Sequence, residues 1–69
     1  MNKVSVPVES LQVGNKLKLK NREEYFPILD FIKVQNEIAS ISCFGFVVDR
    51  KVFTRMFEST LSGNLYIYN

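Results

Sequence analysis

Apolar and polar residues alternate along the first third of the chain, which is typical of β-strands with one face exposed to solvent. Residues 3–8 alternate loosely, and Pro7 predicts that this first strand lies at a sheet edge or ends in a bend. A Val-Gly-Asn turn signal follows at residues 13–15. The run Lys16–Lys20 then alternates strictly, so its two leucines are expected to face the core and its three lysines the solvent.

Two longer apolar runs, Tyr25–Val34 and Ile38–Val48, predict a hairpin whose loop is the Gln-Asn pair between them. With that loop, one face is expected to be the core, and its residues are Ile28, Ile32, Ala39, Ile41 and Cys43. The other face is expected to be half-solvated, and its residues are Leu29, Phe31, Lys33, Ile38, Ser40, Ser42 and Phe44. Asp30 falls on the core face in this register, and a bulge near Pro27 would resolve that conflict by changing the register.

The hydrophobic period lengthens after Asp49, where apolar residues recur at helical spacing. This change predicts an amphipathic helix near residues 50–62, with Asp49 as its N-cap and Gly63 at the position after its last turn. A strand is the competing interpretation, because Val, Phe and Thr also favour strands. Leu65–Tyr68 is expected to be a short last strand. The apolar side of the proposed helix is formed by Val52, Phe53, Met56, Phe57 and Leu61.

These elements predict a single domain over residues 1–69 that is mostly β (α+β). The expected architecture is a small, strongly bent antiparallel sheet or a partly open barrel of about five strands, with the helix before the last strand. The run Val13-Gly14-x-x-Leu17-x-Leu19 resembles the opening turn and strand of SH3-like barrels. This resemblance covers seven residues and implies a fold only.

Composition removes several kinds of chemistry from consideration. The chain has one cysteine, Cys43, and no histidine, so it has neither an intramolecular disulfide nor the ligands of a structural zinc site. The catalytic arrangements that need histidine are absent, and the three glycines are too scattered for a phosphate-binding loop. We expect Cys43 to be a buried apolar residue. The sequence therefore predicts a protein that is not an enzyme and that uses no cofactor or metal.

The expected location is the cytoplasm, since the start of the chain has no apolar signal region and the single thiol suits a reducing compartment. No apolar run is long enough to span a bilayer, so no membrane contact is expected.

The basic strand is the strongest functional candidate. Lys16, Lys18, Lys20 and Arg22 lie within nine residues that contain no acid, a local charge of +4. Alternate strand residues lie about 6.6 Å apart on one face, close to the phosphate spacing of an extended nucleic-acid strand. Bases would stack on neighbouring aromatic rings. The sequence therefore predicts nucleic-acid binding, with stacking from Tyr25, Phe31 or Tyr66 and further positive charge from Lys51 and Arg55.

Two other interpretations of the same residues stay open. Outward lysines also protect a sheet edge from pairing with other chains. The tyrosine-rich last strand would offer Leu65, Tyr66 and Tyr68 to a protein partner, or to a second copy of the chain, if that strand were an edge. In that case the protein would be an interaction module, or a small inhibitor of the phage or mobile-element type that occludes its partner, and a homodimer is compatible with either function.

Overall fold

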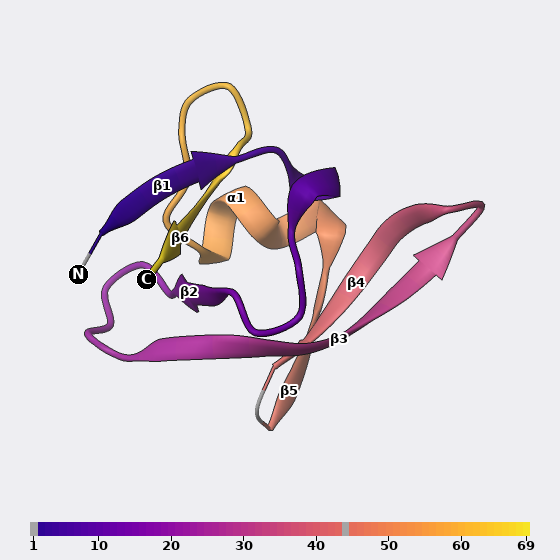
Figure 1. The fold of residues 1–69 in the computed structure, drawn as a ribbon, viewed down its shortest axis with the longest axis horizontal. Coiled ribbons are helices and arrows are strands. Elements are labelled where there is room, and N and C mark those ends of the chain that lie inside the picture. The colour runs from indigo at the N-terminus through magenta and orange to yellow at the C-terminus, as the bar shows by residue number, and fades with distance from the viewer. Residues whose placement is uncertain (1, 44) are drawn as a thin grey trace.

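The computed structural model describes residues 2–43 and 45–69 and shows a six-stranded antiparallel sheet with one short helical segment (Figure 1). The strands are β1 (Lys3–Val6), β2 (Lys16–Lys18), β3 (Tyr25–Val34), β4 (Glu37–Cys43), β5 (Phe46–Asp49) and β6 (Leu65–Tyr68). Their order in the sheet is β1-β6-β2-β3-β4-β5. Within the described residues no pairing joins β1 to β5, so the sheet is open and the expected mostly-β class is confirmed.

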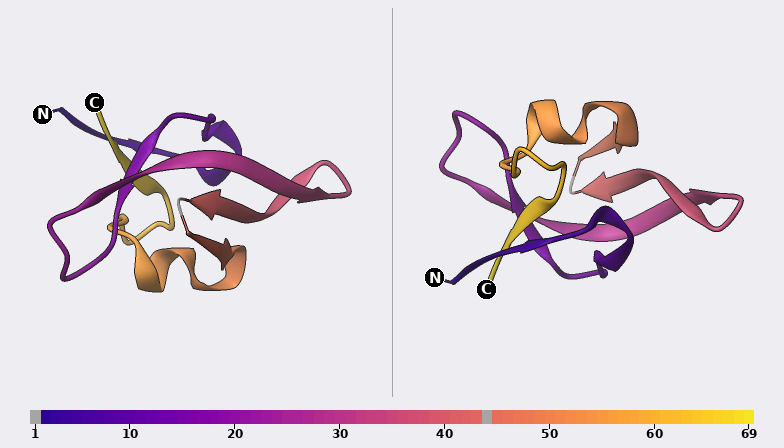
Figure 2. Two further views of the ribbon diagram at one scale, coloured as in Figure 1. Left: turned by 90° about the horizontal axis from the view of Figure 1, so that it is seen from below. Right: turned by 90° about the horizontal axis from the view of Figure 1, so that it is seen from above.

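The long strand β3 joins two halves of the sheet and runs the length of the molecule (Figure 2). Its first residues pair with β2, and the rest of the strand pairs with β4. Between Ile28 and Asp30 the register shifts, and a second shift lies between Ile32 and Lys33. The expected bulge therefore exists near Pro27, and it turns Asp30 outward, where its carboxylate accepts a hydrogen bond from the Phe31 N–H at 2.8 Å.

These two shifts also correct the expected faces of the hairpin. Ile32 was expected in the core and is 50% exposed, whereas Ile38 was expected on the half-solvated face and is buried. The physical reason is that each extra residue in one strand moves all following side chains to the opposite face. Phe31 likewise packs against the core cluster. Phe44, which was also expected on the half-solvated face, lies outside the described residues.

The apolar run 38–48 forms two strands instead of one. It reverses direction before β5, and Gly45 lies in this turn with φ +85°. A Cβ atom at this glycine would meet no atom within 4 Å, so the residue is needed for its backbone conformation and not for space. This turn adds the sixth strand that the sequence pattern did not predict.

The helical segment starts as expected and ends earlier than expected. Asp49 caps it by accepting a hydrogen bond from the Lys51 N–H at 3.0 Å, a 3₁₀ turn (η2, Arg50–Val52) follows, and α1 (Phe53–Met56) completes it. Phe57 then becomes extended and bridges to Leu19. The helix was predicted to continue to residue 62, and it stops because the residues after Met56 pair with the end of β2 instead.

The core lies between the inner faces of the two sheet halves and is covered by the helical segment and by the 3₁₀ turn η1 (Val8–Ser10). Every strand except β1 contributes a buried residue to it. The core cluster is formed by Leu11, Leu17, Ile28, Ile38, Ile41, Cys43, Val48, Phe53, Phe57 and Leu65. No helix in the described part of the chain is long and apolar enough to cross a membrane.

The β3–β4 turn gives the first testable prediction. Gln35 and Asn36 adopt φ values of +53° and +66°, as a type I′ turn requires, and Gln lacks the preference for this region that Asn and Gly have. Changing the pair to Asn-Gly, as Gln35→Asn with Asn36→Gly, should raise the free energy of unfolding by about 1 kcal/mol. The melting temperature should rise by about 4–8 °C. Gln35→Val is the control and should lower the melting temperature, because a β-branched residue is strained at a positive φ. Equal melting temperatures of the wild type and both variants would contradict the turn assignment.

Candidate nucleic-acid interface

Pairing across the sheet gathers tyrosines and lysines on its outer face. Lys3 of β1 is the register partner of Tyr68 in β6, and Tyr68 is in turn the partner of Lys16 in β2. Lys18 is the partner of Tyr25 in β3. Directly opposed residues in antiparallel strands project to the same side, so these residues share one face. We call this surface the tyrosine–lysine face; its members are Lys3, Lys16, Lys18, Tyr25, Tyr66 and Tyr68.

The face exists because inward-pointing and outward-pointing residues alternate along β2 and β6 and are aligned between the two strands. Leu17 and Leu65 point into the core and are fully buried, and their neighbours in β2 and β6 therefore point outward. The result is that all three tyrosines of the chain lie on one face, together with three of its nine lysines and arginines.

Aromatic rings form the floor of this face. The rings of Tyr25 and Tyr68 are tilted against each other with centroids 5.1 Å apart. Tyr68 is only 6% exposed, whereas Tyr25 is 39% exposed and presents its ring to solvent. The ammonium of Lys3 lies 4.4 Å from the ring centroid of Tyr66, a cation–π contact. Two rings are therefore accessible in part, and a third supports them from below.

Glu58 is the one carboxylate that contacts this face among the described residues. Its Oε1 accepts a hydrogen bond from the Tyr68 hydroxyl at 2.6 Å, and its Oε2 lies 3.9 Å from the Lys18 ammonium. The hydrogen bond from Tyr68 is the main cause that lowers the pKa of the Glu58 carboxyl, and the charges of Lys18, Lys3 and Lys20 act in the same direction. Burial, together with the hydrogen bond to Glu58, raises the pKa of Tyr68 above its usual value. Both groups therefore stay in their hydrogen-bonded ionisation states around neutral pH.

Lys20 lies at the rim of the same face. Its ammonium donates a hydrogen bond to the Thr54 carbonyl at 2.8 Å, which ties the end of β2 to α1. Its charge is near enough to lower the pKa of Glu58. Four lysines and one carboxylate thus give the face and its rim a net charge of +3, counting Lys3, Lys16, Lys18, Lys20 and Glu58.

The structure brings together only part of the set that the sequence predicted. Lys16, Lys18, Tyr25 and Tyr66 share the face, and Lys20 lies beside it. Arg22 lies in the loop after β2 and pairs with Glu24 at 3.2 Å, away from the tyrosines. The others lie elsewhere: Phe31 packs on the core, and Lys51 and Arg55 are exposed on the helical segment.

Neither β2 nor β6 has the edge position on which two other interpretations of the sequence depend. Strand β2 lies between β6 and β3, so its lysines do not protect a sheet edge. Strand β6 lies between β1 and β2, and Leu65 and Tyr68 are buried, so this strand offers no free edge for a partner. The reason is that β1 and β2 both pair with β6, which local alternation does not reveal. Pro7 did predict an edge correctly, since β1 ends the sheet.

Sequence reasoning missed Lys3 and Glu58. The signal for Lys3 was its alternation with the valines of β1, which puts Lys3 on the side opposite the core. Glu58 had no usable signal, because its role depends on the early end of α1. Cys43 is buried as expected, and burial raises the pKa of its thiol, which favours the protonated form.

The Tyr68–Glu58 hydrogen bond gives the second prediction. Tyr68→Phe removes it and should lower the free energy of unfolding by about 1 kcal/mol near pH 7. Because the hydrogen bond lowers the pKa of Glu58 in the folded protein, its contribution is present above the ordinary Glu pKa of 4.5 and is lost as pH falls through the native value. Urea unfolding of the wild type and of Tyr68→Phe at about pH 7 and about pH 3 should therefore show that the difference between their free energies of unfolding is smaller at the lower pH. A difference that stays constant with pH would disprove the link to Glu58.

No protein-family model matches this chain, and neither a curated protein nor a solved structure shows significant similarity to it. The function is therefore inferred from the residues and geometry of the chain itself.

Proposed function

We propose that the protein is a non-enzymatic binding protein that holds single-stranded nucleic acid on its tyrosine–lysine face. The observation that carries this proposal is the gathering of all three tyrosines on one face with Lys3, Lys16 and Lys18. Proteins that bind single strands combine aromatic rings, on which bases stack, with cations that follow the backbone.

The spacing of the cations fits this task. Lys16 and Lys18 are alternate residues of one strand, about 6.6 Å apart along the chain. Lys3 lies two strands away from Lys16, across β6, which corresponds to about 10 Å. The rings of Tyr25 and Tyr66 lie between and beside these ammonium groups. A single strand laid across the face would therefore meet rings and cations in turn.

A surface of this kind is expected to bind nucleic acid with little preference for its base sequence. Every base has a flat π-face, so stacking on Tyr25 and Tyr66 does not select one base. No helix long enough to enter a major groove is present in the described part of the chain, since α1 spans four residues. We therefore expect similar affinity for different unpaired sequences and weaker binding to duplexes, whose bases are stacked and unavailable.

The central experiment compares two matched charge reversals. Lys3→Glu with Lys16→Glu changes the face, and Lys33→Glu with Lys51→Glu makes the same change in net charge at exposed positions outside it. Fluorescence anisotropy with labelled unpaired oligonucleotides at low salt should show binding of the wild type and of the control. The face variant should bind at least about tenfold more weakly, and its affinity should depend less on salt concentration. If both variants lost the same affinity, binding would depend on the net charge of the protein and not on this face, which would contradict the proposal. If the wild type did not bind the oligonucleotides at low salt, the proposal would be disproved.

A single carboxylate gives an opposite and independent prediction. Glu58→Gln removes the negative charge from the face and keeps the side-chain shape, so affinity for the oligonucleotide should rise by about two- to fivefold. Glu24→Gln is the matched control, because Glu24 is an exposed carboxylate that pairs with Arg22 away from the face. It should have little effect. A Glu58→Gln variant that binds no better than Glu24→Gln would place the nucleic acid elsewhere.

A further inference from the structure

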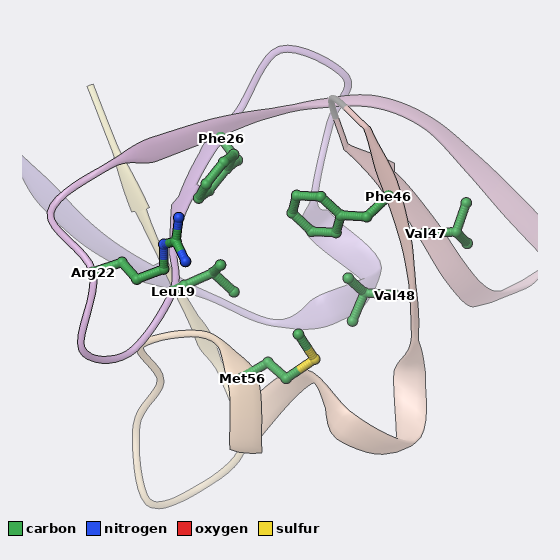
Figure 3. Close-up of a pocket in the computed structure, with 7 residues that line it drawn as sticks. All are labelled: Leu19, Arg22, Phe26, Phe46, Val47, Val48 and Met56. Carbon is green, nitrogen blue, oxygen red and sulfur yellow. The ribbon is translucent and has the colours of Figure 1, made fainter.

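An apolar cleft of about 450 Å³ opens between residues of β3, β5 and α1 (Figure 3). Phe26, which follows the outward-facing Tyr25, points into it and meets Phe46 edge-on, with ring centroids 5.3 Å apart. Met56 of α1 closes it from below in this view and is 38% exposed. We call this the β5 cleft; it is lined by Leu19, Arg22, Phe26, Phe46, Val47, Val48 and Met56.

The cleft borders an unpaired strand edge. Strand β5 ends the sheet, and within the described residues its only ladder is with β4. None of the backbone hydrogen bonds found outside the ladders involves Phe46–Asp49. In an antiparallel pair only alternate residues bond to the partner, so the remaining N–H and C=O groups of β5 point away from β4. Val47 is 60% exposed, and β5 contains no lysine or proline of the kind that usually prevents pairing; its one charged residue, Asp49, stands at the end of the strand.

One cationic side chain, that of Arg22, lies at the mouth of the cleft. The Arg22 side chain, 57% exposed, extends toward the cleft from the loop after β2, and its one ionic partner among the described residues is Glu24. An apolar cavity with an exposed arginine at its rim favours an occupant that has an apolar side chain and an acidic residue beside it.

We propose that β5 binds an extended peptide strand of a partner protein, which adds to the sheet edge and places one large apolar side chain in the β5 cleft. The main chain of the peptide would pair with the free groups of β5, as in other cases of strand addition, and the cleft would select the side chain. An acidic residue close to that side chain would pair with Arg22. This proposal does not depend on nucleic-acid binding, because it uses the opposite side of the sheet.

The experiment selects ligands from displayed random peptides of about 12 residues on the immobilised full chain, and then titrates synthetic versions of the enriched peptides. Enriched peptides should share a large apolar residue with an acidic residue one or two positions away. Binding should shift the amide NMR signals of β5. Met56→Lys, which puts a charge into the cleft, should weaken binding at least about tenfold, whereas the matched control Leu61→Lys, at a fully exposed position in the loop before β6, should not.

The second part of the experiment tests whether Arg22 selects an acidic residue in the peptide. With Arg22→Glu as the bait, the acidic residue of the enriched peptides should be replaced by lysine or arginine. Thermal unfolding of each variant shows that the fold is retained. No enrichment above background would overturn the proposal, and so would peptides whose binding is unaffected by Met56→Lys or whose NMR shifts lie outside β5.

Discussion

The register shift between Ile28 and Asp30 is the constraint on which the rest of this small fold depends. One strand, β3, has to serve two ladders, with β2 on one half and β4 on the other. A strict alternation through β3 would have placed Asp30 in the core and Phe31 in solvent. The extra residue exchanges these two positions, so that an apolar inner face continues across both halves and no polar side chain is buried within the described residues. It also leaves the first half of β3 free to present Tyr25 and Phe26 to opposite sides.

Those two adjacent residues connect the two proposed sites. Tyr25 belongs to the tyrosine–lysine face, and Phe26 lines the β5 cleft on the other side of the same strand. Successive residues of a strand point in opposite directions, so one segment supplies both surfaces without a longer chain. Lys20 and Arg22 belong to the same basic run in the sequence, but the turn at Asn21 separates them, so that Lys20 lies beside the tyrosine–lysine face and Arg22 lines the β5 cleft. Charged residues that are close in the sequence therefore do not form one charged surface when a turn separates them.

Local alternation was sufficient to predict β2, β3, β6, the Gln-Asn turn and the start of the helical segment, because each depends on residues close together in the chain. The features that could not be predicted depend on distant partners. Ile32 and Ile38 exchange faces because of where β4 pairs, and Phe57 leaves the helix because Leu19 offers a bridge. The candidate face was only half predictable for the same reason. The lysines of β2 were visible as a pattern, whereas Lys3 and Glu58 join them through pairings across almost the whole chain.

The position of β6 has a consequence for the order in which the molecule assembles. Within the described residues, strand β1 is attached to the sheet only through β6, although β1 comes first and β6 last among the six strands in chain order. Residues 3–6 therefore have no ladder to join until residues 65–68 are available. Such long-range pairing is slow to form, and folding of β-rich domains with many distant contacts takes about milliseconds to seconds. Until β6 has been synthesised, the lysine and valines of β1 have no strand to pair with, so the first strand of the sheet in chain order is among the last to be incorporated.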